Sequence, residues 1–368
     1  MEILGPADLA ARFAPLAQAR GALLAVSGGP DSVALMLLAH AWAEALTTQS
    51  GPTVRLAVAT VDHGLRPQSS QEAKAVAGWA AALGLPHRIL DWQGEKPVTR
   101  IQERAREARY ALLLAHALEI GADYIVTAHH ADDQAETILF RLLRGSGLSG
   151  LAGMSGAAPR GELIHLRPLL DCPKDALIAV CEARGHPYFR DASNENLAYA
   201  RARLRKLAPI LAEEGLDRAA LLRLGRRAAR ADAALDACVQ RLRAALHATR
   251  ADGVFCAPIG VLKNEPAEIL ARLIEAEIHM LGTDRPLRLD RLETLTASLQ
   301  SALQRGAAWR GSLAGKALIL DRGGVLTVRC ETPRRRGRRP VKSIAHPPLQ
   351  ETAVRTLPLA EADPVTSG

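Results

Sequence analysis

The chain has 368 residues and a net charge of +8, with 47 lysines and arginines against 39 aspartates and glutamates. This excess is compatible with a polyanionic partner but does not require one. An aromatic content of 3% is too low for the flat stacking platform with which sheet-based domains bind RNA. Five cysteines, never two residues apart, give neither a disulfide framework nor a zinc knuckle, and the lack of a signal segment or a membrane-length apolar run predicts a cytoplasmic protein.

The first part of the chain alternates strand-like and helix-like segments. Strands are predicted at about 22–27, 54–61, 87–92 and 123–128, and helices at about 33–46, 69–83, 100–120 and 132–143. Such alternation is typical of an α/β fold in which a parallel sheet carries helices on both faces. Because crossovers between parallel strands are right-handed, we expect the loops that follow the strands to meet along one edge of the sheet.

The loop Ser27–Ser32 joins the first strand to the first helix and reads Ser-Gly-Gly-Pro-Asp-Ser. Gly28 and Gly29 let the backbone approach an anion closely, while the two serines and the free N–H groups of the helix are donors for phosphate. Asp31 cannot bind an anion, but it can hold the Mg²⁺ ion that accompanies a nucleotide. The alternative is a tight turn in which Asp31 caps the helix.

Two further motifs precede the fourth strand. Asp62 and His63 follow the second strand, at the edge where open α/β sheets bind ligands. Arg106 and Arg109 lie one turn apart on one face of the predicted helix at 100–120. Their planar guanidinium groups suit an α-phosphate or the backbone of a nucleotide.

An acidic motif follows the fourth strand. After His129 and His130, the carboxylates of Asp132 and Glu136 are four residues apart and share one face of the next helix. They can coordinate a metal or hold an ammonium group, although a solvated acidic first turn has the same pattern. Either His129 or Asp132 is a candidate general base, and both histidines also fit a buried structural role.

The pattern changes around Pro209. Apolar residues then recur at helical spacing between Leu221 and Leu246, with arginines among them, which predicts a long amphipathic helix. We predict a first domain at 1–210, a mainly helical second domain at 211–330 that begins with this helix, and a basic, disordered tail at 331–368.

Taken in order, these motifs resemble those of one enzyme family. The loop Ser27–Ser32 is similar to the signature of the N-type ATP pyrophosphatases, which cleave ATP between its α- and β-phosphates. With the later stretches Arg144–Met154 and Asp191–Asn194 and the arginines that follow them, residues 20–210 resemble the tRNA(Ile)-lysidine synthetases. That family usually has Asn where this chain has Ala202.

The resemblance implies a reaction in two steps. ATP adenylates the carbonyl oxygen of the wobble cytidine in the CAU anticodon of isoleucine tRNA, and free lysine then displaces AMP to give lysidine. It also implies ATP and Mg²⁺ as cofactors, tRNA(Ile) and lysine as partners, and a Rossmann-like fold. The implied catalytic residues are Asp31, Asp132, Glu136 and Arg109, and the implied metal ligand is Asp31. The implied nucleotide-binding residues are Ser27, Gly28, Gly29, Pro30, Asp31, Ser32, Asp62 and His63. The implied substrate and tRNA contacts are His129, Arg106, Arg201 and Arg205.

Two other functions fit parts of the sequence. One is a non-catalytic tRNA-binding protein that retains the fold, although the intact phosphate loop and the pair of acids argue against it. The other is a different ATP pyrophosphatase, acting in tRNA thiolation or in amidation of a small acid. The unpaired cysteines argue against thiolation, and the arginine-rich second domain argues against a small substrate. The sequence leaves open whether the chain forms a homodimer.

Overall fold

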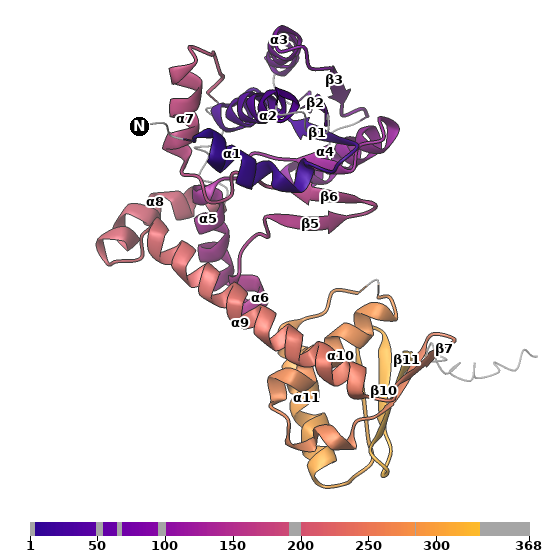
Figure 1. Cartoon of the computed structure of the whole chain (residues 1–368). Helices are drawn as coiled ribbons and strands as arrows, with labels where there is room; N and C mark the ends of the chain where they lie inside the picture. The colour runs from indigo at the N-terminus through magenta and orange to yellow at the C-terminus, as the bar shows by residue number, and fades with distance from the viewer. Residues whose placement is uncertain are drawn as a thin grey trace, which may run out of the picture.

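A computed structural model of the chain describes residues 4–48, 54–64, 68–94, 101–190, 200–283 and 285–331. It consists of an α/β domain and a smaller second domain, joined by one long helix (Figure 1). The predicted fold class is confirmed. The predicted tail lies outside the described residues, apart from Glu331.

The first domain is built on a six-stranded sheet with the strand order β3-β2-β1-β4-β6-β5. The four predicted strands are present and parallel, and Leu24 of the central strand pairs with Val58 on one side and Val126 on the other. Two short strands that the sequence analysis missed extend the sheet, one parallel and one antiparallel. The strands are β1 (Gly21–Ala25), β2 (Arg55–Asp62), β3 (His87–Asp91), β4 (Tyr124–Val126), β5 (Ala157–Arg160) and β6 (Leu163–Leu166).

Helices cover both faces of this sheet, because alternate residues of β1 are apolar on opposite sides. Leu24 faces the core shared with α1, α2, α3 and α7, whereas Leu23 faces Leu113 and Ala117 of α4. The four predicted helices are present. The helices are α1 (Pro6–Phe13), the short 3-10 helix η1 (Ala14–Leu16), α2 (Pro30–Thr48), α3 (Ser69–Ala82), α4 (Ile101–Glu119), α5 (Ala131–Leu142), α6 (Leu148–Leu151) and α7 (Lys174–Ala183). Among the described residues, no helix is long and apolar enough to span a bilayer.

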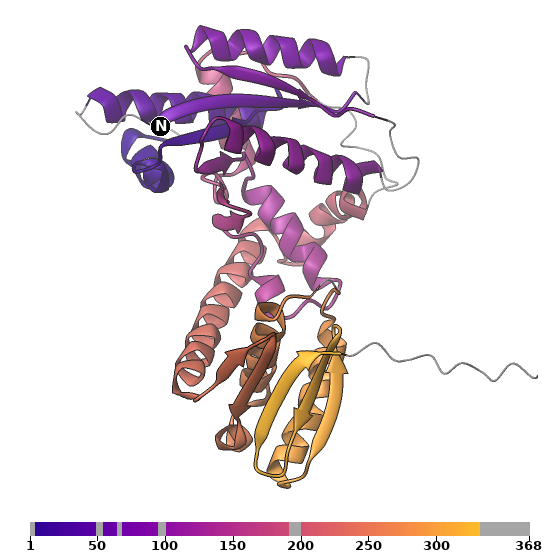
Figure 2. The same ribbon diagram turned by 90° about the vertical axis from the view of Figure 1, so that its right-hand side faces the viewer.

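The long amphipathic helix is confirmed as α9, but the prediction of a mainly helical second domain omitted a sheet. Five antiparallel strands, in the order β7-β8-β11-β10-β9, pack through Phe255, Leu318 and Val328 against α10 and α11 (Figure 2). These strands do not alternate with helices as the parallel strands of the first domain do, and β9, β10 and β11 follow one another directly. The elements are α8 (Ala200–Glu213), α9 (Arg218–Ala245), β7 (Thr249–Ala251), β8 (Val254–Pro258), η3 (Gly260–Asn264), α10 (Ala267–Met280), α11 (Leu289–Gln304), β9 (Trp309–Leu313), β10 (Lys316–Leu320) and β11 (Val325–Cys330).

The helices α8 and α9 are packed against the first domain. The proposed boundary at residue 210 lies within α8, which runs through Pro209 and contacts α5. Where α9 crosses α5, a Cβ on Gly225 would lie 2.5 Å from Cδ1 of the buried Ile138, so only glycine lets these two helices approach so closely.

An ionic junction ties the second domain to this arrangement. Arg272 of α10 donates to Asp232 (2.7 Å) and Asp236 (2.7 Å) of α9 and to Glu268 (2.8 Å) of its own helix. Asp232 also accepts a 2.5 Å hydrogen bond from the hydroxyl of Ser149 in α6. One guanidinium, only 10% exposed, thus links both domains through α9.

A second ion cluster lies inside the second domain. The side chain of Glu277 is fully buried and accepts hydrogen bonds from Arg243 (2.9 Å) and Arg250 (2.6 and 3.0 Å). Removing one member of such a cluster leaves buried charge without a partner, which is costly.

We therefore expect Glu277→Ala to destabilise the second domain by about 3 kcal/mol or more. Hydrogen exchange of the β8 and β10 amides measures this loss without requiring the whole chain to unfold in one step. The matched control is Glu275→Ala, a neighbouring and more accessible acid of α10, which should change exchange little. Equal exchange in the two variants would show that the cluster does not stabilise the domain.

Candidate functional site

The loop Ser27–Ser32 has a backbone that only glycine can adopt at its second position. Gly28 has φ +88°, and a Cβ there would lie 2.8 Å from Cδ2 of Phe189 and 3.2 Å from Cγ2 of Val76. Its carbonyl accepts a 2.9 Å hydrogen bond from the backbone N–H of Phe189. The loop is therefore held in place by a residue far along the chain.

Hydrogen bonds within the loop fix its two serines. The Ser32 hydroxyl donates to the carbonyl of Gly29 (2.9 Å) and accepts from the backbone N–H of Ser27 (3.1 Å). The hydroxyls of Ser27 and Ser32 are 3.3 Å apart. Because Pro30 begins α2 here, the positive end of the helix dipole faces the loop, which favours a bound anion.

The carboxylate of Asp31 fits a cation ligand. Its Oδ1 atom is buried and has no hydrogen-bond partner in the described structure, and its Oδ2 atom lies 3.5 Å from Nε2 of His130. A buried carboxylate oxygen without a partner is unfavourable unless a cation compensates it. The predicted Mg²⁺ ligand is thus compatible with its surroundings.

His130 joins the phosphate loop to the acidic motif. It caps α5, with its Nδ1 accepting from the N–H of Asp133 (3.4 Å), and it also lies 3.7 Å from the carboxylate of Asp132. Burial alone would lower the pKa of His130, but the carboxylates of Asp31, Asp133 and Asp132 outweigh it and raise the pKa. The sequence analysis allowed a buried structural role for His130, and these contacts fit that role, because the ring lies between Asp31 and the start of α5.

Both candidate lysine-binding acids are paired with arginines. Asp132 accepts from Arg218 of α9 (2.9 Å) and from the backbone N–H of Lys174 (3.0 Å), contacts that outweigh its burial and lower its pKa. Glu136 forms a two-pronged ion pair with Arg205 of α8, at 2.5 and 3.2 Å. Arg205, predicted to contact tRNA, thus holds an acid of the site. The side chain of Arg201 lies outside the described residues.

Asp62 has a local structural role in this structure. It accepts hydrogen bonds from the N–H of Gly64 (2.8 Å) and the hydroxyl of Ser70 (2.5 Å). These bonds, with one from Ser69, overcome the effect of burial and keep the pKa of Asp62 low. His63 lies beside it, edge-on to Trp92 with ring centroids 5.9 Å apart.

A cluster of arginines surrounds Tyr110 of α4. The guanidinium carbons of Arg160, Arg106 and Arg109 lie 3.8, 5.1 and 6.0 Å from the centroid of its ring. Within the described part of the chain, none of these three arginines pairs with a carboxylate. Burial lowers the pKa of Arg109. The predicted pair Arg106 and Arg109 thus belongs to a larger basic cluster.

Two histidines beside this cluster are held neutral. Thr127, just after β4, bonds through its hydroxyl to Nδ1 of His129 (2.7 Å) and Nε2 of His165 (2.8 Å). Burial, followed by the charge of Arg167, lowers the pKa of His129 to about 2 and that of His165 to about 3. A group with so low a pKa is a poor proton acceptor at neutral pH, which disfavours His129 as the general base.

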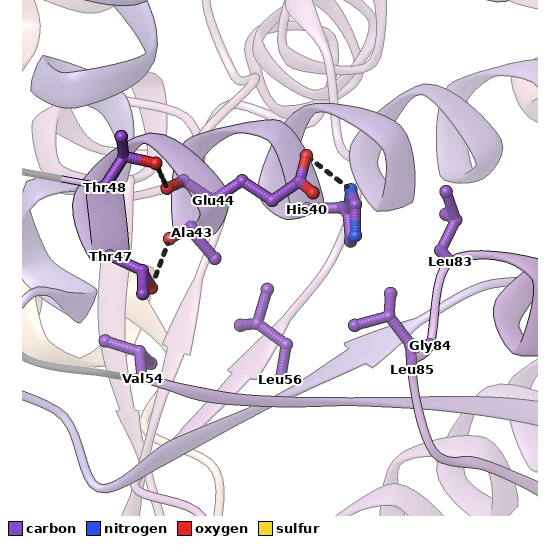
Figure 3. Close-up of a pocket in the computed structure, with 10 residues that line it drawn as sticks. All are labelled: His40, Ala43, Glu44, Thr47, Thr48, Val54, Leu56, Leu83, Gly84 and Leu85. Atoms are coloured by element: carbon purple, nitrogen blue, oxygen red, sulfur yellow. Dashed lines mark hydrogen bonds and ion pairs between the residues drawn. The ribbon is translucent and has the colours of Figure 1, made fainter.

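A cavity of about 520 Å³ lies away from all of these motifs. Its lining includes the His40–Glu44 pair, 3.4 Å apart, and Val54 and Leu85 (Figure 3). These residues lie at the amino ends of β2 and β3, whereas the motifs lie at the carboxyl ends, where α/β sheets bind ligands. The cavity is therefore not the candidate site.

Comparison with known proteins decides the family. Residues 7–211 match the PP-loop domain family. The tRNA(Ile)-lysidine synthase of Methylobacterium sp. (strain 4-46) is 47% identical over 344 residues, which cover 91% of this chain and 97% of the relative. That of Bradyrhizobium diazoefficiens is 44% identical, covering 83% and 86%. The chain belongs to the tRNA(Ile)-lysidine synthase family.

A solved structure supports the fold of this lysidine synthase family member. The U34-tRNA thiolase NcsA from Methanococcus maripaludis, with its [4Fe-4S] cluster, aligns with a TM-score of 0.50 over 60% of this chain and 77% of that one. At 16% identity the likeness concerns the fold alone.

Some residues of the candidate site had no signal in the sequence. Arg160 and His165 come from β5 and β6, strands of four residues that were not predicted. Arg218 and Phe189 were not predicted as site residues. Recognising the hairpin around Gly161 would have placed Arg160 and His165 beside α4.

We expect His129 and His165 to remain neutral across pH 5–9 in the folded protein. Unfolded histidine titrates near 6.5, so below that pH the unfolded state binds more protons and stability falls as the pH drops towards 3. His130 acts in the opposite sense, because its raised pKa contributes stability below 6.5 that is lost as the pH rises through its folded value.

NMR of ring-labelled histidine checks the prediction, with the signal of the exposed His247 as an internal reference. Substituting His129→Gln should flatten the acid limb of the stability profile. A His129 signal that titrates near 6.5 would contradict the neutral assignment.

Proposed function

We propose that this chain forms lysidine on the isoleucine tRNA with a CAU anticodon. ATP adenylates the carbonyl oxygen of the wobble cytidine, and the ε-amine of free lysine then displaces AMP. The single observation that carries the proposal is the contact of His130 with Asp31, which brings the phosphate loop and the acidic motif together at the carboxyl edge of the sheet. We place the reaction in the cytoplasm, where tRNA, ATP and free lysine occur together.

In the first step, negative charge moves onto the departing pyrophosphate. The hydroxyls of Ser27 and Ser32 and the amides of Gly28 and Gly29 suit the binding and alignment of this group. When bound at Asp31, Mg²⁺ would neutralise part of the developing charge. Little proton transfer is needed, so this step depends on alignment and electrostatics.

The second step needs an anionic site for lysine. Asp132 and Glu136 have the charge to bind its ammonium group, which would replace Arg218 and Arg205 at the two carboxylates. Because its pKa is lowered, Asp132 suits the binding of a cation better than the removal of a proton.

Contacts with tRNA are supported by unpaired basic residues. Arg223, Arg226, Arg227 and Arg230 of α9 are exposed and share one face, opposite the face that packs on α5 and α6. No described carboxylate pairs with them, so they suit a phosphate backbone.

The cysteines argue against thiolation as the reaction. Those of the described residues are free thiols, and they do not form the close pairs in sequence that thiolation chemistry uses. A homodimer remains a prediction.

The direct test is incubation with ATP, labelled lysine and isoleucine tRNA bearing a CAU anticodon. We expect ATP-dependent label in the tRNA, and none with a tRNA lacking the wobble cytidine. Label in neither tRNA, with tRNA binding intact, would favour the non-catalytic alternative.

We expect Asp31→Asn to slow adenylation by orders of magnitude, because each ~1.4 kcal/mol of lost transition-state stabilisation is tenfold in rate. Binding of tRNA should survive, and calorimetry should show that Mg²⁺ no longer strengthens ATP binding. Asp91→Asn, at the carboxyl end of β3, is the matched control. Pyrophosphate release at the wild-type rate would refute the metal role of Asp31.

We expect Asp132→Asn to separate the two steps. Adenylation of tRNA should remain measurable, while lysine transfer should weaken at least tenfold, since a hydrogen bond to a charged group contributes about 1.5–3 kcal/mol. Rapid-quench assays of each step measure this, with the exposed Asp175→Asn of α7 as the control. If adenylation collapsed and lysine affinity stayed the same, Asp132 would belong with the metal.

A further inference from the structure

The arginine cluster around Tyr110 concentrates positive charge without acidic compensation. We define it as Arg106, Arg109, Arg160 and Arg167. The first three lie within 6.0 Å of one ring centroid. Arg167 donates to the carbonyl of Ser155 (2.7 Å) and to Nδ1 of His165 (2.9 Å), while its Nε is buried without a hydrogen-bond partner.

The energetics of the cluster point to an anion. Contact with the face of Tyr110 offsets only part of the mutual repulsion between guanidinium groups, since a cation–π contact contributes about 0.5–2 kcal/mol. Burial lowers the pKa of the adjacent His129 and His165, and the charges of these arginines lower it further. A bound anion would relieve the repulsion and accept hydrogen bonds from several guanidinium groups.

Within the cluster, Arg160 is the arginine that lies far from the phosphate loop. The loop follows β1, and α4, which carries Arg106 and Arg109, packs against β1 as well as β2 and β4. Arg160 belongs to the edge strand β5, which lies three strands from β1 in the sheet order. With strands about 4.8 Å apart, the backbones of β1 and β5 are on the order of 15 Å apart. The phosphates of one ATP are joined through single bridging oxygens, so a triphosphate seated on the loop does not extend to β5, whereas an RNA strand does.

We propose that this cluster is a phosphodiester subsite for the tRNA backbone beside the wobble nucleotide, and that Arg160 of the edge strand β5 is one of its phosphate contacts. The inference rests on the proposed function, because it takes tRNA as the substrate. Arg160 closes the cluster from the outer edge of the sheet, and Arg167 acts as a positioning residue that holds His165.

The test uses the full chain and an anticodon stem-loop RNA. Arg160→Met should weaken binding of this RNA about tenfold, the size of one charge-assisted hydrogen bond. It should also reduce the slope of log affinity against log salt by about 0.7, the value for one phosphate contact in single-stranded RNA. The matched control is Arg88→Met on β3, the opposite edge strand. ATP affinity should be unchanged in both variants.

A chemical probe identifies the phosphate. Single methylphosphonates, which remove one phosphodiester charge at a time, should weaken binding of the wild type at one position near the wobble nucleotide and have no further effect there on Arg160→Met. If Arg160→Met does not fold, Arg160→Lys, which keeps the charge, takes its place and should retain the methylphosphonate effect with a smaller loss of affinity.

Two results would overturn the subsite. RNA binding by Arg160→Met equal to that of Arg88→Met would make Arg160 a scaffold residue, and a selective loss of ATP affinity would assign the cluster to the α-phosphate of ATP. If either result is obtained and the wild type still forms lysidine, the subsite is refuted but the proposed function is retained. Arg160-dependent RNA binding without lysidine formation would refute the function and retain the subsite.

Discussion

The contact between His130 and Asp31 is the constraint on which the site depends. Asp31 lies in the first turn of α2, which follows β1, and His130 lies between β4 and α5, yet their side chains are 3.5 Å apart. His130 also caps α5, so the same ring sets the position of the phosphate loop and the start of the acidic helix. Three nearby carboxylates raise its pKa against the effect of burial. A side chain without ring nitrogens would lose both the cap of α5 and the contact with Asp31.

The site divides into an acidic half and a basic half. On one side of the loop that follows β4, the carboxylates of Asp132 and Glu136 are neutralised by arginines from α8 and α9. On the other side, the arginines around Tyr110 have no acidic partner among the described residues. When substrates bind, the acidic half therefore exchanges its arginines for another cation, whereas the basic half gains an anion. The two halves suit an amino-acid cation and an RNA backbone.

The sequence predicted the framework of the first domain and the order of its motifs. Strand-like runs that alternate with helical patterns marked the four parallel strands and the helices between them. Strands outside this alternation were missed, which includes the edge strand that carries Arg160 and the sheet of the second domain. The pairing of Arg205 with Glu136 was also beyond reach, because it depends on how α8 packs on α5 and no local pattern encodes that contact.

The junction formed by Ser149, Asp232 and Arg272 has a consequence for experiments in salt. The side chains of Arg272 and Asp232 are 10% and 20% exposed, so their ion pair is screened less than contacts between surface charges. The arginines on the outer face of α9 are exposed, and their attraction to a polyanion weakens steeply with ionic strength. Added salt should therefore loosen the hold on RNA while leaving the angle between the two domains unchanged. A salt titration of RNA binding then measures that interface alone, with no contribution from a change in the shape of the protein.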